Sequence, residues 1–112
     1  MPPETKKYLF DILEACALIR QFSSGKSFTD YENDPMLRSA VERQFGIIGE
    51  ALSRAVKIEP SLTGRIRDVR RIINFRNVLI HGYAVISNHV VWGIIENDLE
   101  RLTQEVDALY RE

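Results

Sequence analysis

The sequence predicts an all-α domain, and three observations lead to this fold class. Apolar residues recur at helical spacing in four separate segments. No stretch shows the alternation of apolar and polar residues, bounded by turn signals, that is typical of a strand. The chain has 112 residues, of which 45% are hydrophobic and 28% charged, so it can build one core but not two. We therefore expect a single domain over residues 1–112, folded as an antiparallel four-helix bundle.

The first predicted helix runs from about Glu4 to Phe22 and ends before a Ser-Ser-Gly sequence. The residues on its apolar face are Tyr8, Leu9, Ile12, Cys16 and Ile19. Because Cys16 lies on this face and has no histidine near it in sequence, a buried thiol is favoured over a catalytic one.

The second predicted helix follows a polar linker over residues 24–33. Asn33 or Asp34 can cap it, and Pro35 suits its first turn. Its inward positions are Leu37, Val41, Phe45, Ile48 and Leu52. The linker is long enough to carry function.

The third and fourth predicted helices follow a break in the pattern at residues 57–64. The third runs from about Arg65 to His81, and Gly82 suits the left-handed position after its last turn. The fourth runs from near Asn88 to near Tyr110. Its inward stripe is Val91, Ile95, Leu99, Leu102, Val106 and Leu109, with Trp92 beside it.

Arg76 departs from the pattern of the third helix, because it falls within the apolar face. The residues of that face are Ile66, Val69, Ile72, Ile73, Leu79 and Ile80. An arginine there is costly unless something pairs with it. Two interpretations stay open: a structural role, either snorkelling or in an ion pair with a carboxylate such as Glu50, or a guanidinium held for an anion.

The opposite face of the third helix is basic and rich in amides. Its residues are Arg67, Arg70, Asn74, Asn77 and His81. Together with Arg65, Arg71 and Arg76, the segment holds a third of the chain's 15 lysines and arginines. The net charge of -1 gives no general attraction to a polyanion. Binding to nucleic acid would therefore depend on this local cluster.

His81 can have two compatible roles. At the end of a helix it can interact with the last carbonyls, and an imidazole also exchanges protons near neutral pH. Arg76 and His81 lie about 140° apart around an unbroken helix. A joint site therefore requires the helix to unwind near Gly82 or a second subunit to complete it, and we predict a homodimer. His89 has no comparable setting and is predicted to be a surface residue.

The pattern Arg76-x-x-x-x-His81-x-Tyr83 resembles the R-x-x-x-x-H-x-Y signature of the HepT-like proteins, a family within the HEPN (higher eukaryotes and prokaryotes nucleotide-binding) superfamily. Residues 41–51, residues 75–83 and the residues from Val91-Trp92 to Asp98-Leu99 also resemble that family. Residues 60–64 depart from it, because they lack the proline-tryptophan pair of many relatives. This departure bears on local loop contacts and not on the motif.

The resemblance implies an RNase toxin of a toxin-antitoxin system, with RNA as its substrate and a minimal nucleotidyltransferase (MntA-like) as its antitoxin. The antitoxin would silence the toxin by AMPylation of Tyr83. In metal-independent cleavage, His81 would move protons and Arg76 would stabilise charge on the phosphorane. Asn77 would orient the phosphate or cap the helix end.

Two residues of the second helix, Arg43 and Glu50, lie on one side of it with Gly46 between them. They can brace the site or the dimer, or they can form a solvated or bridging charged pair while Gly46 and Gly49 permit a close helix approach. Neither is predicted to be catalytic.

A non-catalytic alternative stays open, because a fold resemblance does not guarantee chemistry. The chain could be a scaffold or nucleotide-binding subunit that partners a nucleotidyltransferase. We expect no cofactor and no metal, since the two histidines share no ligand spacing. With one cysteine, no apolar run of membrane-spanning length and no apolar signal core, the sequence predicts a cytoplasmic protein without a membrane partner.

Overall fold

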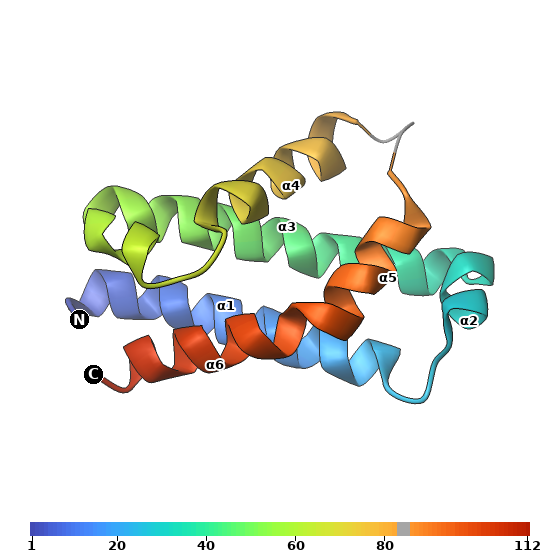
Figure 1. Ribbon diagram of the computed structural model, residues 1–112, viewed down its shortest axis with the longest axis horizontal. Coiled ribbons are helices and arrows are strands. Elements are labelled where there is room, and N and C mark those ends of the chain that lie inside the picture. The colour runs from blue at the N-terminus through green and yellow to red at the C-terminus, as the bar shows by residue number, and fades with distance from the viewer. Residues whose placement is uncertain (83–85) are drawn as a thin grey trace.

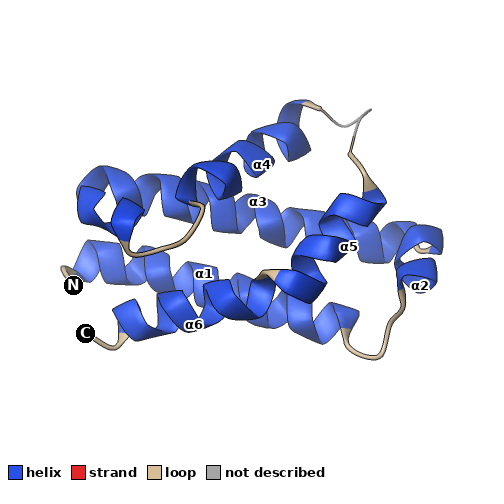
Figure 2. Cartoon of the chain, viewed as in Figure 1, coloured by secondary structure: helices blue, strands red, loops and turns tan. Residues whose placement is uncertain are grey.

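The structure is a computed structural model that describes residues 1–82 and 86–112 (Figure 1). Within these residues the regular structure is helical throughout, with no strand (Figure 2), which confirms the predicted all-α fold. The elements are α1 (Pro3–Ser23), α2 (Phe28–Asn33), α3 (Pro35–Ile58), the 3₁₀ helix η1 (Pro60–Gly64), α4 (Val69–His81), α5 (Asn88–Asn97) and α6 (Leu99–Tyr110).

The bundle is built around the pair formed by α1 and α3, which pack along most of their lengths (Figure 1). Helix α6 packs on α1, and α4 packs on α3. The far end of α4 rises away from the rest of the bundle (Figure 1). The predicted inward residues of the first, second and fourth helices are buried, except for the half-buried Tyr8 and Ile95. Side-chain burial thus fixes α1, α3 and α6 more firmly than the outer helix α4.

Three features of the predicted helix arrangement are wrong. The polar linker contains α2, whose first turn is closed by a capping box between Ser27 and Asp30. The third helix begins at Val69 rather than Arg65, because Asp68 adopts the left-handed conformation with φ 61°. The fourth helix is divided at Asp98, whose backbone ends α5 and begins α6.

The prediction that Gly82 is left-handed is wrong, because its φ of -112° lies outside the left-handed region. Other local predictions are confirmed. Asp34 caps α3 by accepting a hydrogen bond of 3.1 Å from the Leu37 amide, and Pro35 opens the helix. Cys16 is buried, and burial raises the pKa of its thiol to about 11, so it remains a protonated core residue at neutral pH. No helix in the described parts of the chain combines the length and apolarity needed to cross a membrane.

The close approach of α3 and α4 depends on Gly49. A Cβ atom added there would lie 2.5 Å from the Cβ atom of Arg76, whereas one added at Gly46 would meet none of the described residues within 4 Å. A contact of 2.5 Å between carbon atoms is far inside their optimal separation of about 3.5 to 4.0 Å. Of the two glycines that the sequence singles out, Gly49 therefore permits the helix contact.

We expect Gly49→Ala to lower the free energy of unfolding by about 1 to 3 kcal/mol, because α4 must move off α3. The matched variant Gly46→Ala should instead raise it by up to about 1 kcal/mol, since alanine favours the helix and the site has room. Chemical denaturation of both variants measures the two effects. A Gly49→Ala chain as stable as the Gly46→Ala chain would contradict the close contact.

Candidate active site

Arg76 reaches from α4 to α3 and pairs with Glu50. Its Nη2 atom lies 2.9 Å from Glu50 Oε2, and its side chain is 29% exposed. The other carboxylate oxygen, Glu50 Oε1, accepts a hydrogen bond of 2.7 Å from Arg54 Nε. One carboxylate is thus shared by two guanidinium groups. The structure therefore contains the ion pair that the sequence proposed as the structural role of Arg76.

The pKa of the Glu50 carboxyl is held below its ordinary value, first by the hydrogen bond from Arg54 and then by the charge of Arg76. Glu50 therefore stays ionised at neutral pH and can hold Arg76 in place. Exposed ion pairs contribute little to stability. We therefore assign this pair to positioning the guanidinium rather than to stabilising the fold.

Two open grooves lie beside Arg76, with volumes of about 590 Å³ and 420 Å³. The larger one is formed by α1, α3 and α4, and Tyr8, Arg43 and Arg54 line it together with Arg76. Carboxylates line it as well, namely Asp11, Glu42 and Glu50. Its positive and negative groups are therefore balanced in number, which gives a polyanion little net attraction.

His81 ends α4 with its side chain exposed, and it makes no side-chain hydrogen bond or ion pair with the described residues. The Gly82 amide donates a hydrogen bond of 2.7 Å to the Val78 carbonyl, so the helix stays wound through His81. Arg76 faces α3 while His81 faces outward. Unwinding before Gly82, one of the two ways to join them, is therefore not observed.

The remaining predicted site residues are placed as follows. Asn77 is exposed on α4 next to Arg76 and makes no side-chain hydrogen bond with the described residues. Tyr83, the predicted modification site, lies outside the described residues. His89 is exposed, as predicted, and its ring stacks on that of Phe28 with centroids 4.0 Å apart. His89 thus has an aromatic stacking partner on α2, whereas His81 has none among the described residues.

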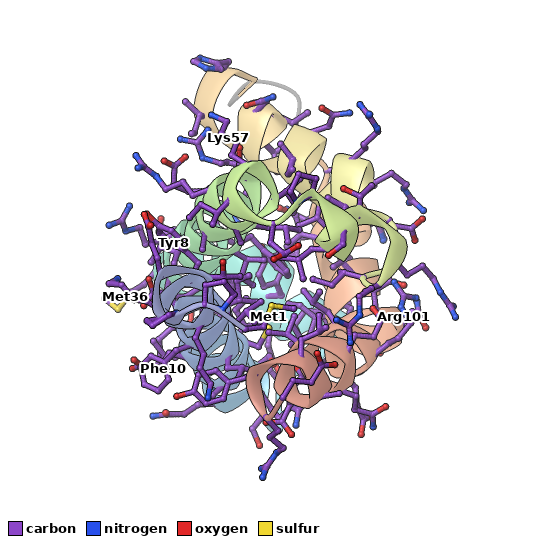
Figure 3. All side chains as sticks on the ribbon, turned by 90° about the vertical axis from the view of Figure 1, so that its left-hand side faces the viewer. Met1, Tyr8, Phe10, Met36, Lys57 and Arg101 are labelled. Atoms are coloured by element: carbon purple, nitrogen blue, oxygen red, sulfur yellow. The ribbon has the colours of Figure 1, made fainter. Side chains whose placement is uncertain are left out.

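An apolar groove of about 310 Å³ lies between α4 and the α5–α6 segment. Phe75 and Val78 from α4 and Val90 and Ile94 from α5 line it, and Val78 is 42% and Val90 54% exposed. Figure 3 shows Arg101, which lines this groove, on the opposite side of the molecule from Tyr8 of the larger groove. This groove was not predicted from the sequence, although the position of Val78 outside the inward face of its helix is a signal of an apolar residue on the surface.

These features define a class of small helical proteins that carry an arginine and a histidine five residues apart in the closing turns of an outer helix. The chain belongs to the ribonuclease HepT-like family, whose model matches residues 12–109. This match confirms the resemblance based on the Arg76, His81 and Tyr83 pattern and the HEPN-like fold.

Named relatives agree with this assignment. The chain is 33% identical over 104 residues to "Probable ribonuclease HepT" of Thermococcus cleftensis, covering 93% of this chain and 94% of the relative. It is 31% identical over 108 residues to "Putative RNase MJ1380" of Methanocaldococcus jannaschii, covering 95% and 96%. It is 29% identical over 104 residues to "Putative RNase TTE0752" of Caldanaerobacter subterraneus, covering 93% and 92%. No solved structure gives a significant match.

Proposed function

We propose that this chain is an endoribonuclease toxin that cleaves RNA without a metal ion at a cleft between two copies. The observation that carries the proposal is the presence on one helix of Arg76, held against α3 by Glu50, and of an exposed His81 that has no hydrogen-bond or ion-pair partner among the described residues. Family membership and the ribonuclease names of relatives support it.

The chemistry requires a proton carrier and a cation. In RNA cleavage of this kind, a 2'-oxygen attacks the adjacent phosphorus, the bond from phosphorus to the 5'-oxygen breaks, and the proton lost at one oxygen is regained at the other. The His81 imidazole can accept the first proton or donate the second. The Arg76 guanidinium can hold two phosphate oxygens and stabilise the negative charge that grows on the phosphorane. Asn77, one residue away, can orient the phosphate.

A second copy of the chain would complete the site. Arg76 and His81 face different directions on a helix that stays wound through His81, so one chain does not bring them together. The exposed apolar groove formed by Val78 and Val90 is a surface that a second copy could cover. Association there would place the ends of two α4 helices near each other.

The function is tested by incubating purified wild-type chain and an Arg76→Ala/His81→Ala chain with total RNA in the presence of a chelator. We expect cleavage by the wild-type chain and intact RNA with the double variant, because both chemical roles are removed. Growth arrest on expression should follow the same order. Intact RNA with unmodified wild-type protein would refute the nuclease.

AMPylation of Tyr83 by a nucleotidyltransferase antitoxin (MntA-like) would control this activity. AMP next to the histidine adds bulk and negative charge, which would exclude and repel the RNA backbone. We expect Tyr83→Phe to keep its RNA cleavage and to escape silencing, because phenylalanine has no hydroxyl to accept AMP. Mass spectrometry of both chains after incubation with the co-expressed enzyme and ATP checks this: AMP found on the Tyr83→Phe chain would point to another residue.

The non-catalytic alternative is a scaffold or nucleotide-binding subunit for such a nucleotidyltransferase. It is favoured by one observation, the engagement of Arg76 with Glu50, which a purely structural arginine would also show. Wild-type chain that binds the enzyme but leaves RNA intact would support it.

A further inference from the structure

The segment from Val69 to Ile95 contains no aspartate or glutamate, although the whole chain has 16. It covers all of α4 and most of α5. Three arginines, Arg70, Arg71 and Arg76, lie on α4. A protein with a net charge of -1 thus has one helix that presents only positive or neutral side chains. Such a local asymmetry is typical of a surface that faces a polyanion.

One exposed stripe on α4 leads to His81. Arg70, Asn74, Asn77 and His81 are separated by four, three and four residues, the spacing that aligns side chains on one face of a helix. All of them are exposed in the single chain, where Asn74 also lines the apolar groove of Val78 and Val90. At a rise of 1.5 Å per residue, the stripe from Arg70 to His81 is roughly 16 Å long. It is therefore long enough to contact several consecutive nucleotides.

The arginine at the start of the stripe is available for a ligand. Arg71 lies 3.7 Å from Asp68, and Arg76 pairs with Glu50. No carboxylate of residues 1–82 or 86–112 lies within ion-pair distance of Arg70. The larger groove near Arg76 offers a poorer path for RNA, because Asp11 and Glu42 line it. The stripe has no acidic member.

We propose that this stripe is the binding track for single-stranded RNA. Its residues are Arg70, Asn74, Asn77 and His81. This inference rests on the proposed nuclease function and names its substrate class. Arg70 would bind a phosphate displaced from the scissile one, as a charge-assisted contact. Asn74 and Asn77 would hydrogen-bond to the backbone, its 2'-hydroxyls or base edges between that phosphate and His81.

A single strand fits this track better than a duplex for a chemical reason. The attacking 2'-oxygen and the departing 5'-oxygen must lie on opposite sides of the phosphorus. A paired A-form strand does not adopt that alignment, whereas a flexible single strand can be turned into it. A narrow row of two amides and one guanidinium also contacts only one backbone. Arg70 and Asn74 are thus binding residues, while His81 is the catalytic residue at the end of the track.

The test measures binding of a labelled single-stranded RNA by fluorescence anisotropy, on a His81→Ala background that prevents cleavage. Adding Arg70→Ala should raise Kd about 10-fold at low salt, because one charge-assisted contact is lost. The dependence of log Kd on log salt should become shallower by about 0.7 for the phosphate contact removed. Arg20→Ala is the matched control, since it removes an exposed arginine from α1.

The possible outcomes distinguish failure of the proposed binding track from failure of the proposed nuclease function. Equal Kd and salt dependence for the Arg70→Ala and Arg20→Ala chains, with both shown to be folded by circular dichroism, would overturn the track. Equal affinity for a duplex of the same sequence would overturn the choice of single strand. If the wild-type chain leaves RNA intact in the chelated assay, the proposed function fails. If it cleaves RNA while Arg70→Ala has no effect on binding, only the track fails.

Discussion

Replacing His81 by alanine is expected to slow RNA cleavage by roughly 100- to 10,000-fold, the range for loss of a general acid or base. Stability should change little, because the side chain is exposed and makes no hydrogen bond with the described residues. Single-turnover cleavage of a single-stranded RNA gives the rate, and chemical denaturation gives the stability. His89→Ala is the matched control, since it removes an exposed histidine that stacks on Phe28. Equal loss of activity in both variants would contradict the assignment.

The geometry adds a second part to this prediction, because Arg76 and His81 of one chain face different directions. If each site combines Arg76 of one subunit with His81 of the other, mixing inactive Arg76→Ala and inactive His81→Ala chains restores activity. With random exchange of subunits, half the dimers are mixed and each has one intact site, so about a quarter of the wild-type rate should return. No recovery after confirmed subunit exchange would show that each site uses both residues from the same chain.

Much of the fold can be predicted from the spacing of apolar residues. The errors arise where a helix boundary depends on hydrogen bonds or backbone conformation instead of on that spacing. The long helices α1 and α3 were predictable, because their buried faces repeat at helical spacing over many residues. Helix α2 was missed because its first turn depends on the capping box of Ser27 and Asp30 rather than on an apolar face, and this signal can be read from sequence. The start of α4 was misplaced, since the apolar spacing does not show the left-handed conformation of Asp68 or the hydrogen bond that the neighbouring Arg67 amide donates to Glu105.

The residues of the candidate site can be singled out from the sequence, whereas their geometry cannot. Arg76 could be singled out because a charge in an apolar arc needs a partner, and Glu50 was named as a possible one. The i,i+4 spacing of Glu50 and Arg54 could have indicated their ion pair, but the sequence could not show that Arg76 binds the same carboxylate, because that contact joins two helices. It could not show the apolar groove of Val78 and Val90 either, since that surface combines two helices whose relative placement is a tertiary property.

Arg76→Ala is expected to lower the cleavage rate roughly 100- to 1,000-fold, the effect of removing one preorganised group that stabilises the transition state. The fold should tolerate the change. Glu50 keeps its hydrogen bond from Arg54, so no carboxylate loses all its partners. Arg76→Lys is the informative companion, because it keeps the charge but cannot bind two phosphate oxygens in a fork. A lysine variant as fast as the wild type would contradict bidentate phosphate binding.

Glu50→Gln separates positioning of Arg76 from catalysis by Arg76. The inner part of the Arg76 side chain is fixed against Gly49, and its guanidinium is held by Glu50. Loss of the charge at Glu50 should therefore lower kcat about 10-fold and leave KM nearly unchanged, since orientation of the guanidinium affects the transition state most. A faster Glu50→Gln enzyme would instead mean that the carboxylate masks the arginine.

The pH dependence gives an independent check on the role of Glu50. The pKa of its carboxyl is lowered in the folded chain, so its contribution to positioning is present above its ordinary pKa and disappears only as the pH falls through the lowered value. Between about pH 5 and 8 the ion pair should therefore stay intact. Glu50→Gln should reduce kcat by the same factor across that window, and any change in rate with pH there must come from another group. A Glu50→Gln variant that alters the shape of the pH profile would show that the carboxylate itself exchanges protons during cleavage.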